Sequence, residues 1–229
     1  MKNIVWLTAV YSLLLLVSSC TKSEEPLKER DLNYDLNCEK DSTCFYYTFN
    51  AEKIFLDYST LCITLKFSNE VSKEYLKYII EKNNELDSIS IINEDENLAY
   101  GYLKNNMNCE NIQTLLTRLT TEEQIICANP NFITKEAKYR GIQPNNKEAL
   151  MAMTDEFIVE NHNSLNLEKI NALILQTKTT LLRDNGNWAV ISADKNSVGN
   201  SLEMSRYFYE TGSFEYSHPN FLVSISLFK

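Results

Sequence analysis

The stretch Ala128-Asn129-Pro130-Asn131-Phe132-Ile133 returns 89 residues later as Ser217-His218-Pro219-Asn220-Phe221-Leu222. Internal similarity of this kind has to be recognised first, because a repeated segment organises the whole fold. The text that precedes each Pro-Asn-Phe triplet also follows one order of apolar and polar runs. We therefore interpret most of the chain as two successive copies of one structural unit.

The first copy predicts four strands and two helices. Apolar residues alternate with polar ones from Leu61 to Phe67, which predicts a half-buried strand. Ser68 or Ser72 can cap a following helix, whose apolar residues recur at helical spacing. The last strand is expected over Glu123–Ala128 and should end at Pro130, because proline cannot donate to a strand ladder. The other elements are expected at 71–80 (helix), 88–92 and 98–103 (strands) and 112–119 (helix).

The second copy repeats this order. Asn166 is a plausible cap of its first helix. Asn185-Gly186 predicts a hairpin turn in which both central residues take positive φ. Gly212 is expected to end the second helix in a left-handed conformation. The elements are expected at 156–161, 179–183, 188–192 and 214–216 (strands) and at 167–174 and 198–209 (helices).

Both copies thus read β-α-β-β-α-β, the order of the ferredoxin-like unit. The fold class is expected to be α+β, with two tandem ferredoxin-like domains whose antiparallel sheets carry helices on one face. The free sheet face needs cover from a partner or tolerates solvent, and an exposed Trp188 there would mark an interface. The first domain is placed at 45–134, a linker at 135–153 and the second domain at 154–229.

The N-terminus predicts export and lipidation. Residues 1–19 combine a positive start with an apolar run that is too short to span a bilayer comfortably, which is typical of a signal peptide. Residues 16–20, Leu-Val-Ser-Ser-Cys, resemble a bacterial lipobox, so Cys20 is expected to carry the lipid. Several acyl chains on one residue give stable anchoring. Residues 20–44 would form a lipidated tether, and we expect an outer membrane lipoprotein of the cell envelope that can be exposed at the surface.

Composition limits the classes of partner. The formal net charge is −9 and the pI is near 4.9. Nucleic-acid binding needs clustered Lys and Arg, so no nucleic acid is expected. The sequence contains no Gly-rich phosphate loop, and no cofactor is expected.

Five cysteines remain after Cys20 in a compartment where disulfides persist. Cys38 and Cys44 flank a short acidic loop and could close a small ring. Cys62 and Cys127 fall in strands expected to be neighbours. They could form a buried pair of thiols or a cross-strand disulfide, and buried packing is favoured. The odd count leaves at least one thiol free or intermolecular. Only two histidines and no Cys-x-x-Cys are present, so no metal site is expected.

The second copy resembles the N-terminal prodomain of subtilisin-like serine proteases of the fervidolysin-like kind. The resemblance is carried by residues 154–159 (Thr-Asp-Glu-Phe-Ile-Val), 207–212 (Tyr-Phe-Tyr-Glu-Thr-Gly) and 214–221 (Phe-Glu-Tyr-Ser-His-Pro-Asn-Phe). The first copy is similar to the segment that precedes this prodomain in lipoprotein subtilases, through Tyr46-Tyr47, residues 52–56 and residues 128–132. The resemblance covers roughly residues 45–229. His218 departs from it, because the family tends to have an acidic residue there.

This resemblance implies chaperoning and inhibition of a subtilisin-like serine protease, in trans or in cis within an intact precursor. The sheet face would pack on the protease and the C-terminal tail would lie in the substrate cleft as an added strand. The expected partner-binding residues are Pro219, Asn220, Phe221, Val223, Ile225, Leu227, Phe228 and Lys229.

No catalytic residue is expected in this chain. A subtilase needs Asp, His and Ser around an oxyanion hole, and the blocks Asp-Ser/Thr-Gly, His-Gly and Gly-Thr-Ser do not occur in the sequence. His162 and His218 are interpreted as surface-loop histidines. Three hypotheses follow: a propeptide-like inhibitor or chaperone, the N-terminal fragment of a serine protease without its catalytic domain, and a surface interaction lipoprotein.

Overall fold

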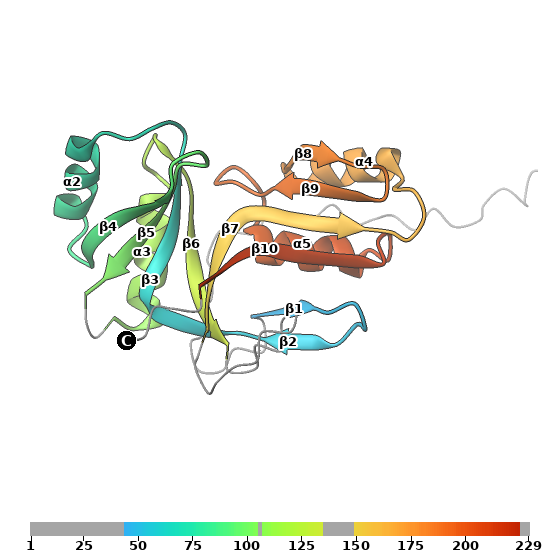
Figure 1. Ribbon diagram of the computed structural model, residues 1–229, viewed down its shortest axis with the longest axis horizontal. Helices are drawn as coiled ribbons and strands as arrows, with labels where there is room; N and C mark the ends of the chain where they lie inside the picture. Colours follow the sequence, from blue (N-terminus) through green and yellow to red (C-terminus); the bar gives the residue numbers. More distant parts are fainter. Residues whose placement is uncertain (1–43, 105–106, 135–148, 225–229) are drawn as a thin grey trace, which may run out of the picture. The chain divides into compact units, whose positions relative to one another are not determined.

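The computed structural model describes residues 44–104, 107–134 and 149–224 as an α+β fold (Figure 1). The predicted α+β class is therefore confirmed. Within the described ranges the structure has ten strands and four helices. The strands are β1 Phe45–Tyr47, β2 Lys53–Phe55, β3 Asp57–Phe67, β4 Leu86–Asn93, β5 Leu98–Leu103, β6 Ile125–Thr134, β7 Ala149–Glu160, β8 Thr180–Asp184, β9 Trp188–Ser192 and β10 Tyr216–Ser224. The helices are α2 Lys73–Lys82, α3 Cys109–Leu119, α4 Leu167–Thr177 and α5 Ser201–Glu210.

Strands β3 to β10 form one antiparallel eight-stranded sheet, and β1 and β2 form a separate two-stranded hairpin. The sheet has the order β4-β5-β3-β6-β7-β9-β8, with β10 on the other edge of β7. The first half of the chain thus contributes β6-β3-β5-β4 and the second half β10-β7-β9-β8. In each half the first strand lies between the third and the fourth, so the two halves share one strand order.

Local signals in the sequence account for most of the element boundaries. The side chains of Ser72 and Asn166 accept hydrogen bonds from the first turns of α2 and α4, as predicted. Gly212 has φ +68 just after α5, which confirms the left-handed end of that helix. The prediction for Asn185-Gly186 is wrong in one respect: among these two residues only Gly186 has positive φ, at +84. The Asp184 carboxylate accepts from the Gly186 N–H at 2.8 Å and stabilises this different turn.

Each half has its own apolar core between its strands and its helices. The first core joins the alternate residues Ile63, Leu65 and Phe67 of β3 to α2 and α3. The second core joins Phe157 and Val159 of β7 to α4 and α5. Residues that alternate along a strand point to opposite faces, so in both halves the helices cover one sheet face. The helix residues that complete these cores are Ile79, Ile112, Leu115, Leu116, Leu119, Ile170, Met204 and Phe208.

The two Pro-Asn-Phe triplets lie inside strands, which corrects the prediction that Pro130 ends its strand. β6 and β10 both run through the proline, Pro130 opposite Ile63 and Pro219 opposite Phe157. Both prolines adjoin an irregularity in strand pairing. Proline is tolerated at such bulges because no ladder hydrogen bond is required there.

At the first triplet and beyond it, β6 pairs with β3 on one side and with β7 of the second half on the other. Asn131 to Thr134 of β6 lie opposite Ala152 to Ala149 of β7. Residues 149–153, which the sequence analysis places in the linker, are therefore strand. The sheet is continuous across the expected domain boundary.

A third cluster of apolar residues lies where the halves join. The aromatic residues of the two triplets meet there, with 6.3 Å between the ring centroids of Phe132 and Phe221. Met151 and Met153 of β7 pack beside them. The β1–β2 hairpin adds Tyr46 to this cluster. We call it the junction core, and its buried members are Cys44, Tyr46, Leu56, Phe132, Met151, Met153 and Leu202.

Candidate functional site

The helix-free side of the second half carries a mixed apolar and charged surface. Ile158 of β7 lies opposite Val190 of β9 and His218 of β10, so these three side chains share a face. This face points away from the core residues Phe157 and Val159. We call it the second-half face, and it comprises Glu156, Ile158, Glu160, Arg183, Trp188, Val190, Ser192, Tyr216 and His218.

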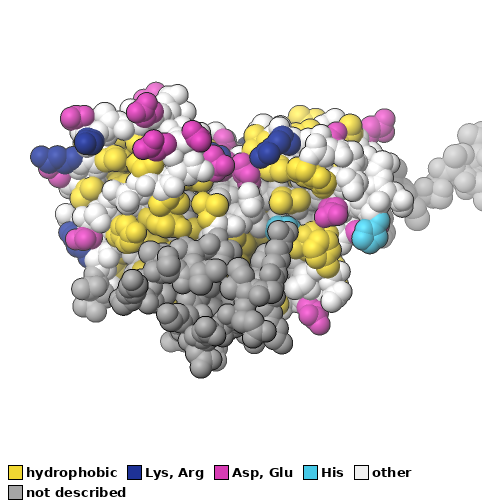
Figure 2. Space-filling view, viewed as in Figure 1, with side chains coloured by type: hydrophobic (Ala, Val, Ile, Leu, Met, Phe, Trp, Pro, Cys, Tyr) yellow, Lys and Arg dark blue, Asp and Glu magenta, His cyan; other side chains and the backbone are white. Residues whose placement is uncertain are grey.

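The accessible part of the second-half face is apolar in its middle. Ile158, Trp188 and His218 are half-buried, whereas Arg183 at the outer strand is exposed. In Figure 1 the strands of this half are drawn in front of α4 and α5, so Figure 2 views the side away from these helices. Hydrophobic side chains gather there beside a histidine, with charged groups at the margin (Figure 2). Apolar anchors within a charged rim are typical of protein interfaces.

The corresponding face of the first half is partly covered by the second half. Cys62 of β3 and Tyr100 of β5 form a buried cluster with Leu150 and Ala152 of β7. Tyr102 and Leu222 pack against this cluster. The expectation of a free sheet face in each copy therefore does not hold for the first half at this place, since β7 lies over it.

A buried ion pair also spans the two halves. Lys66 Nζ of β3 lies 2.7 Å from Asp155 Oδ1 of β7, and the Ser192 hydroxyl donates to Asp155 Oδ2 at 2.7 Å. The Lys66 and Asp155 side chains are only 17% and 3% exposed. Burial alone lowers the pKa of Lys66, but the negative charge of Asp155 and the hydrogen bond to it outweigh burial, so the pKa of Lys66 is raised. Lys66 therefore stays charged and ties β3 to β7.

Part of the predicted partner-binding segment packs and hydrogen-bonds within the fold. Pro219 is buried, and the ring of Phe221 lies 5.7 Å from that of Tyr46. The Thr154 hydroxyl donates to the Asn220 carbonyl at 2.7 Å, and the Asn220 amide donates to Glu156 at 3.1 Å. Val223 lies in β10 opposite Met151. The described residues do not include Ile225, Leu227, Phe228 and Lys229, so binding by this segment stays a prediction. Cys20 also lies outside the described residues.

Asn131 is the asparagine of the first triplet, and its contacts give a physical reason for an asparagine at this position. Asn131 is fully buried, and its side-chain oxygen accepts from the Thr64 hydroxyl at 2.6 Å and from the Met153 N–H at 3.3 Å. Its amide donates to Cys62 Sγ at 3.3 Å. One asparagine thus hydrogen-bonds to β3 and β7 where the strand ladder is irregular, and buried polar groups need such partners.

Sequence reasoning missed the β1–β2 hairpin, which borders the second-half face. The ring of Phe49 in the hairpin turn stacks on Tyr216 at 3.7 Å between centroids, and Tyr47 stacks on Tyr209 at 4.3 Å. The Tyr47 hydroxyl also donates to Glu210 at 3.0 Å. The only signal in the sequence is the aromatic density of residues 45–55, because strands of three residues are too short for a recognisable alternation.

The cysteines differ in part from expectation. Cys62 and Cys127 are buried free thiols, which confirms buried packing over a cross-strand disulfide. Burial raises the pKa of both thiols, so they stay protonated. Cys44 is not disulfide-bonded, so the possible Cys38–Cys44 ring does not form. Its Sγ lies 3.0 Å from the Tyr58 hydroxyl. Cys109 is disulfide-bonded.

The two histidines lie at separate positions. His162 is exposed, with its Nδ1 3.4 Å from a carboxylate oxygen of Glu215. His218 lies in β10 and is half-buried, so its interpretation as a surface-loop histidine is wrong. Its Nδ1 lies 2.7 Å from the Pro219 carbonyl oxygen. Across the ranges that the structure describes, no group of three or more His, Cys, Asp or Glu side chains is placed to hold a metal ion. In the same ranges, no helix has the length and apolar character needed to cross a membrane.

No protein-family model and no curated protein matches this chain.

Proposed function

We propose that the chain is a propeptide-like binding module that inhibits or helps to fold a subtilisin-like serine protease. The order β10-β7-β9-β8, with α4 and α5 on one face, supports assigning a ferredoxin-like unit to the second half. The order β6-β3-β5-β4 supports the same assignment for the first half. The chain acts in this proposal by binding alone, without catalytic residues or a cofactor, and its partner is met in trans or in cis.

One observation carries the proposal: the two halves share a strand order, and the second keeps partly accessible apolar side chains on its helix-free side. In the first half that side is partly filled by β7 through Leu150 and Ala152. In the second half Ile158 and Trp188 remain partly accessible. We therefore assign partner binding to the second half.

Inhibition of subtilisin-like proteases tests the proposal. We expect the purified chain to inhibit a subtilisin-like protease in a peptide-hydrolysis assay and Trp188→Ala to weaken inhibition by roughly tenfold or more, because a central aromatic anchor contributes about 2 kcal/mol or more to an interface. Removal of residues 225–229 should weaken inhibition further, since a strand added in the cleft supplies main-chain hydrogen bonds. That deletion leaves β10 intact, since this strand ends at Ser224.

The matched control is Leu175→Ala. Leu175 is 82% exposed on α4, the helix side of the second half, so inhibition should not change. A chain that leaves a panel of subtilisin-like proteases fully active, and does not speed their refolding, rules out this function. Capture of envelope proteins or glycans without any protease would instead favour a surface interaction lipoprotein.

We place the mature chain at the outer membrane of the cell envelope, anchored through lipid on Cys20, because residues 16–20 fit a lipobox. Mass spectrometry of the N-terminal peptide should show a lipid mass on Cys20 and no residues 1–19. The variant Cys20→Ser should remain unlipidated, and an unmodified Cys20 in the wild-type protein would disprove the anchor.

A further inference from the structure

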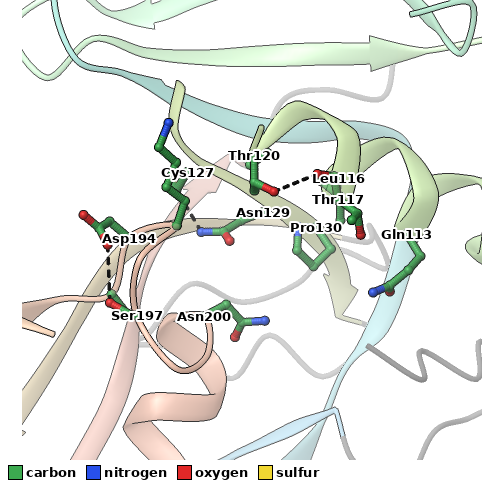
Figure 3. A pocket seen from close by; sticks show the side chains of 13 residues that line it. Gln113, Leu116, Thr117, Thr120, Cys127, Asn129, Pro130, Asp194, Ser197 and Asn200 are labelled. Carbon is green, nitrogen blue, oxygen red and sulfur yellow. Dashed lines mark hydrogen bonds between the residues drawn. The ribbon is translucent and has the colours of Figure 1, made fainter. Parts of the chain in front are cut away.

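A cavity of about 80 Å³ lies between the first half and the loop that connects β9 to α5. Its walls come from three places: α3, the part of β6 that leads to Pro130, and residues 193–200 (Figure 3). A buried water needs roughly 10–15 Å³ of such space. The cavity therefore has room for several waters, or for a ligand group of about four to six heavy atoms.

Three carboxamide side chains line this cavity: Gln113 of α3, Asn129 of β6 and Asn200 before α5. Figure 3 shows them approaching the same space from three elements. Asn129 is only 4% exposed, and its amide nitrogen donates to the Thr154 carbonyl at 3.0 Å. Among the described residues its side-chain oxygen has no hydrogen-bond partner. This oxygen is available as an acceptor, so the position favours a ligand that donates.

The other two amides supply complementary groups. The Gln113 side-chain oxygen is buried and has no hydrogen-bond partner within the described part of the chain. The Asn200 oxygen accepts from the Glu203 N–H at 3.0 Å, which leaves its amide nitrogen available as a donor. The cavity thus offers unused acceptors together with an unused donor.

The charged residues at the wall disfavour an anion. The Asp194 carboxylate lines the cavity and repels negative charge. The ammonium of Lys195 is held by the backbone carbonyls of Glu122 and Glu123, at 2.8 and 3.2 Å. Leu116, Ala128 and Pro130 provide an apolar wall for a short alkyl stem.

We propose that this cavity binds a primary carboxamide on a short alkyl stem. A carboxamide has one acceptor and two donor hydrogens, which matches the free groups of Gln113, Asn129 and Asn200. A carboxylate lacks the donors, and an ammonium group lacks the acceptor. The group can belong to a free small amide or to an Asn or Gln side chain of a protein partner. The inference is independent of protease binding, because it uses a different part of the molecule.

The test is a titration of the isotope-labelled chain with propionamide, followed by NMR. We expect saturable shifts of the side-chain amides of Asn129 and Asn200, with a dissociation constant of the order of millimolar for a ligand of this size. Propionate and propylamine should bind at least tenfold more weakly. Equal binding of all three compounds, or shifts that never saturate, would show a cavity that holds only water and would overturn the proposal.

Gln113→Leu provides the sharper variant. The Gln113 side chain makes no hydrogen bond in the described structure, so its replacement should leave the fold unchanged, which thermal unfolding checks. We expect propionamide binding to weaken about tenfold, the loss of one hydrogen bond. The control Gln176→Leu makes the same change on α4, outside the cavity, and should bind like the wild type. Unchanged binding by Gln113→Leu would contradict the assignment.

A second arm of the titration identifies the source of the carboxamide. A capped Gly-Gln-Gly peptide with an N-methylamide end is compared with the matching Gly-Leu-Gly peptide. Binding of the Gln peptide at least as tight as that of propionamide assigns the site to a partner's side chain. Binding of propionamide with no binding of the Gln peptide assigns it to a free small amide.

Discussion

Replacing Asp155 by alanine should lower the free energy of unfolding by about 3–5 kcal/mol, because it leaves a partly buried cation without its counter-charge. Lys66 would lose its partner at 2.7 Å, and the Ser192 hydroxyl would lose its acceptor. The Lys66 side chain is 17% exposed. Because water reaches part of this side chain, we expect the effect near the lower end of this range. Urea unfolding followed by circular dichroism measures the change.

Two further variants separate the charge effect from a general loss of packing. Glu81→Ala breaks the exposed Lys77–Glu81 pair of α2 and should cost less than about 1 kcal/mol. The double variant Lys66→Met, Asp155→Leu removes both charges and should recover most of the stability lost in Asp155→Ala. An Asp155→Ala protein as stable as the Glu81→Ala protein would show that the ion pair does not hold the halves together.

Phe132→Ala should destabilise the protein by about 3–5 kcal/mol, the usual cost of removing a fully buried aromatic ring. Phe132 is 0% exposed and lies in the junction core beside Tyr58 and Phe221, with 5.1 and 6.3 Å between ring centroids. Because this core belongs to both halves, we expect both to lose stability together. Hydrogen exchange measured separately for β5 and β9 reports on each half.

The other phenylalanines supply a graded control. Phe221→Ala, at a half-buried ring in the same core, should cost roughly half as much because less apolar surface is lost. Phe49→Ala, at a ring that is 65% exposed, should cost under about 1.5 kcal/mol, the scale of one aromatic pair. Loss of protection in β5 alone after Phe132→Ala would mean that the halves are energetically independent.

The connection between the two halves affects how tightly the proposed module can bind. If the junction core and the Lys66–Asp155 pair hold the halves rigidly, the second-half face is presented without an ordering cost, which favours affinity. The hairpin contributes to this rigidity, since Arg206 of α5 lies 4.9 Å from the centre of the Phe45 ring. The N-terminal part of the first half is therefore part of the support of the second.

Much of the local structure follows from short-range signals. Alternation over Leu61–Phe67 predicted most of β3, and the caps Ser72 and Asn166 are the observed starts of α2 and α4. Such signals act between residues three or four positions apart, so they survive in any tertiary context. The repeat of Pro-Asn-Phe likewise indicated two units of one strand order.

Long-range features escaped prediction for physical reasons. In the sequence, Pro130 indicates the end of a strand. In the structure, its neighbour Asn131 continues the strand and pairs with Ala152 of the other half. The pairing of β6 with β7 joins residues about twenty positions apart through a segment of Gly, Pro and Asn that looks like a linker. Nothing in either strand alone specifies that partner, because ladder hydrogen bonds are the same for every sequence.

The candidate site was predictable only in outline. Trp188 and the free sheet face of the second half follow from the expected strand order. The covering of the first face by Leu150 and Ala152, and the meeting of Gln113, Asn129 and Asn200 around one cavity, depend on how the halves join.

The amino-acid sequence by itself determined the four helices, most of the strands of the eight-stranded sheet and the shared strand order of the two halves, because periodicity, capping and turn chemistry act locally. The tertiary structure alone decided that the two sheets join, that the hairpin packs on α5 and that one helix-free face stays accessible. Those features depend on contacts between side chains far apart in the chain, such as Lys66 with Asp155 and Phe132 with Phe221, whose partners only the folded backbone selects.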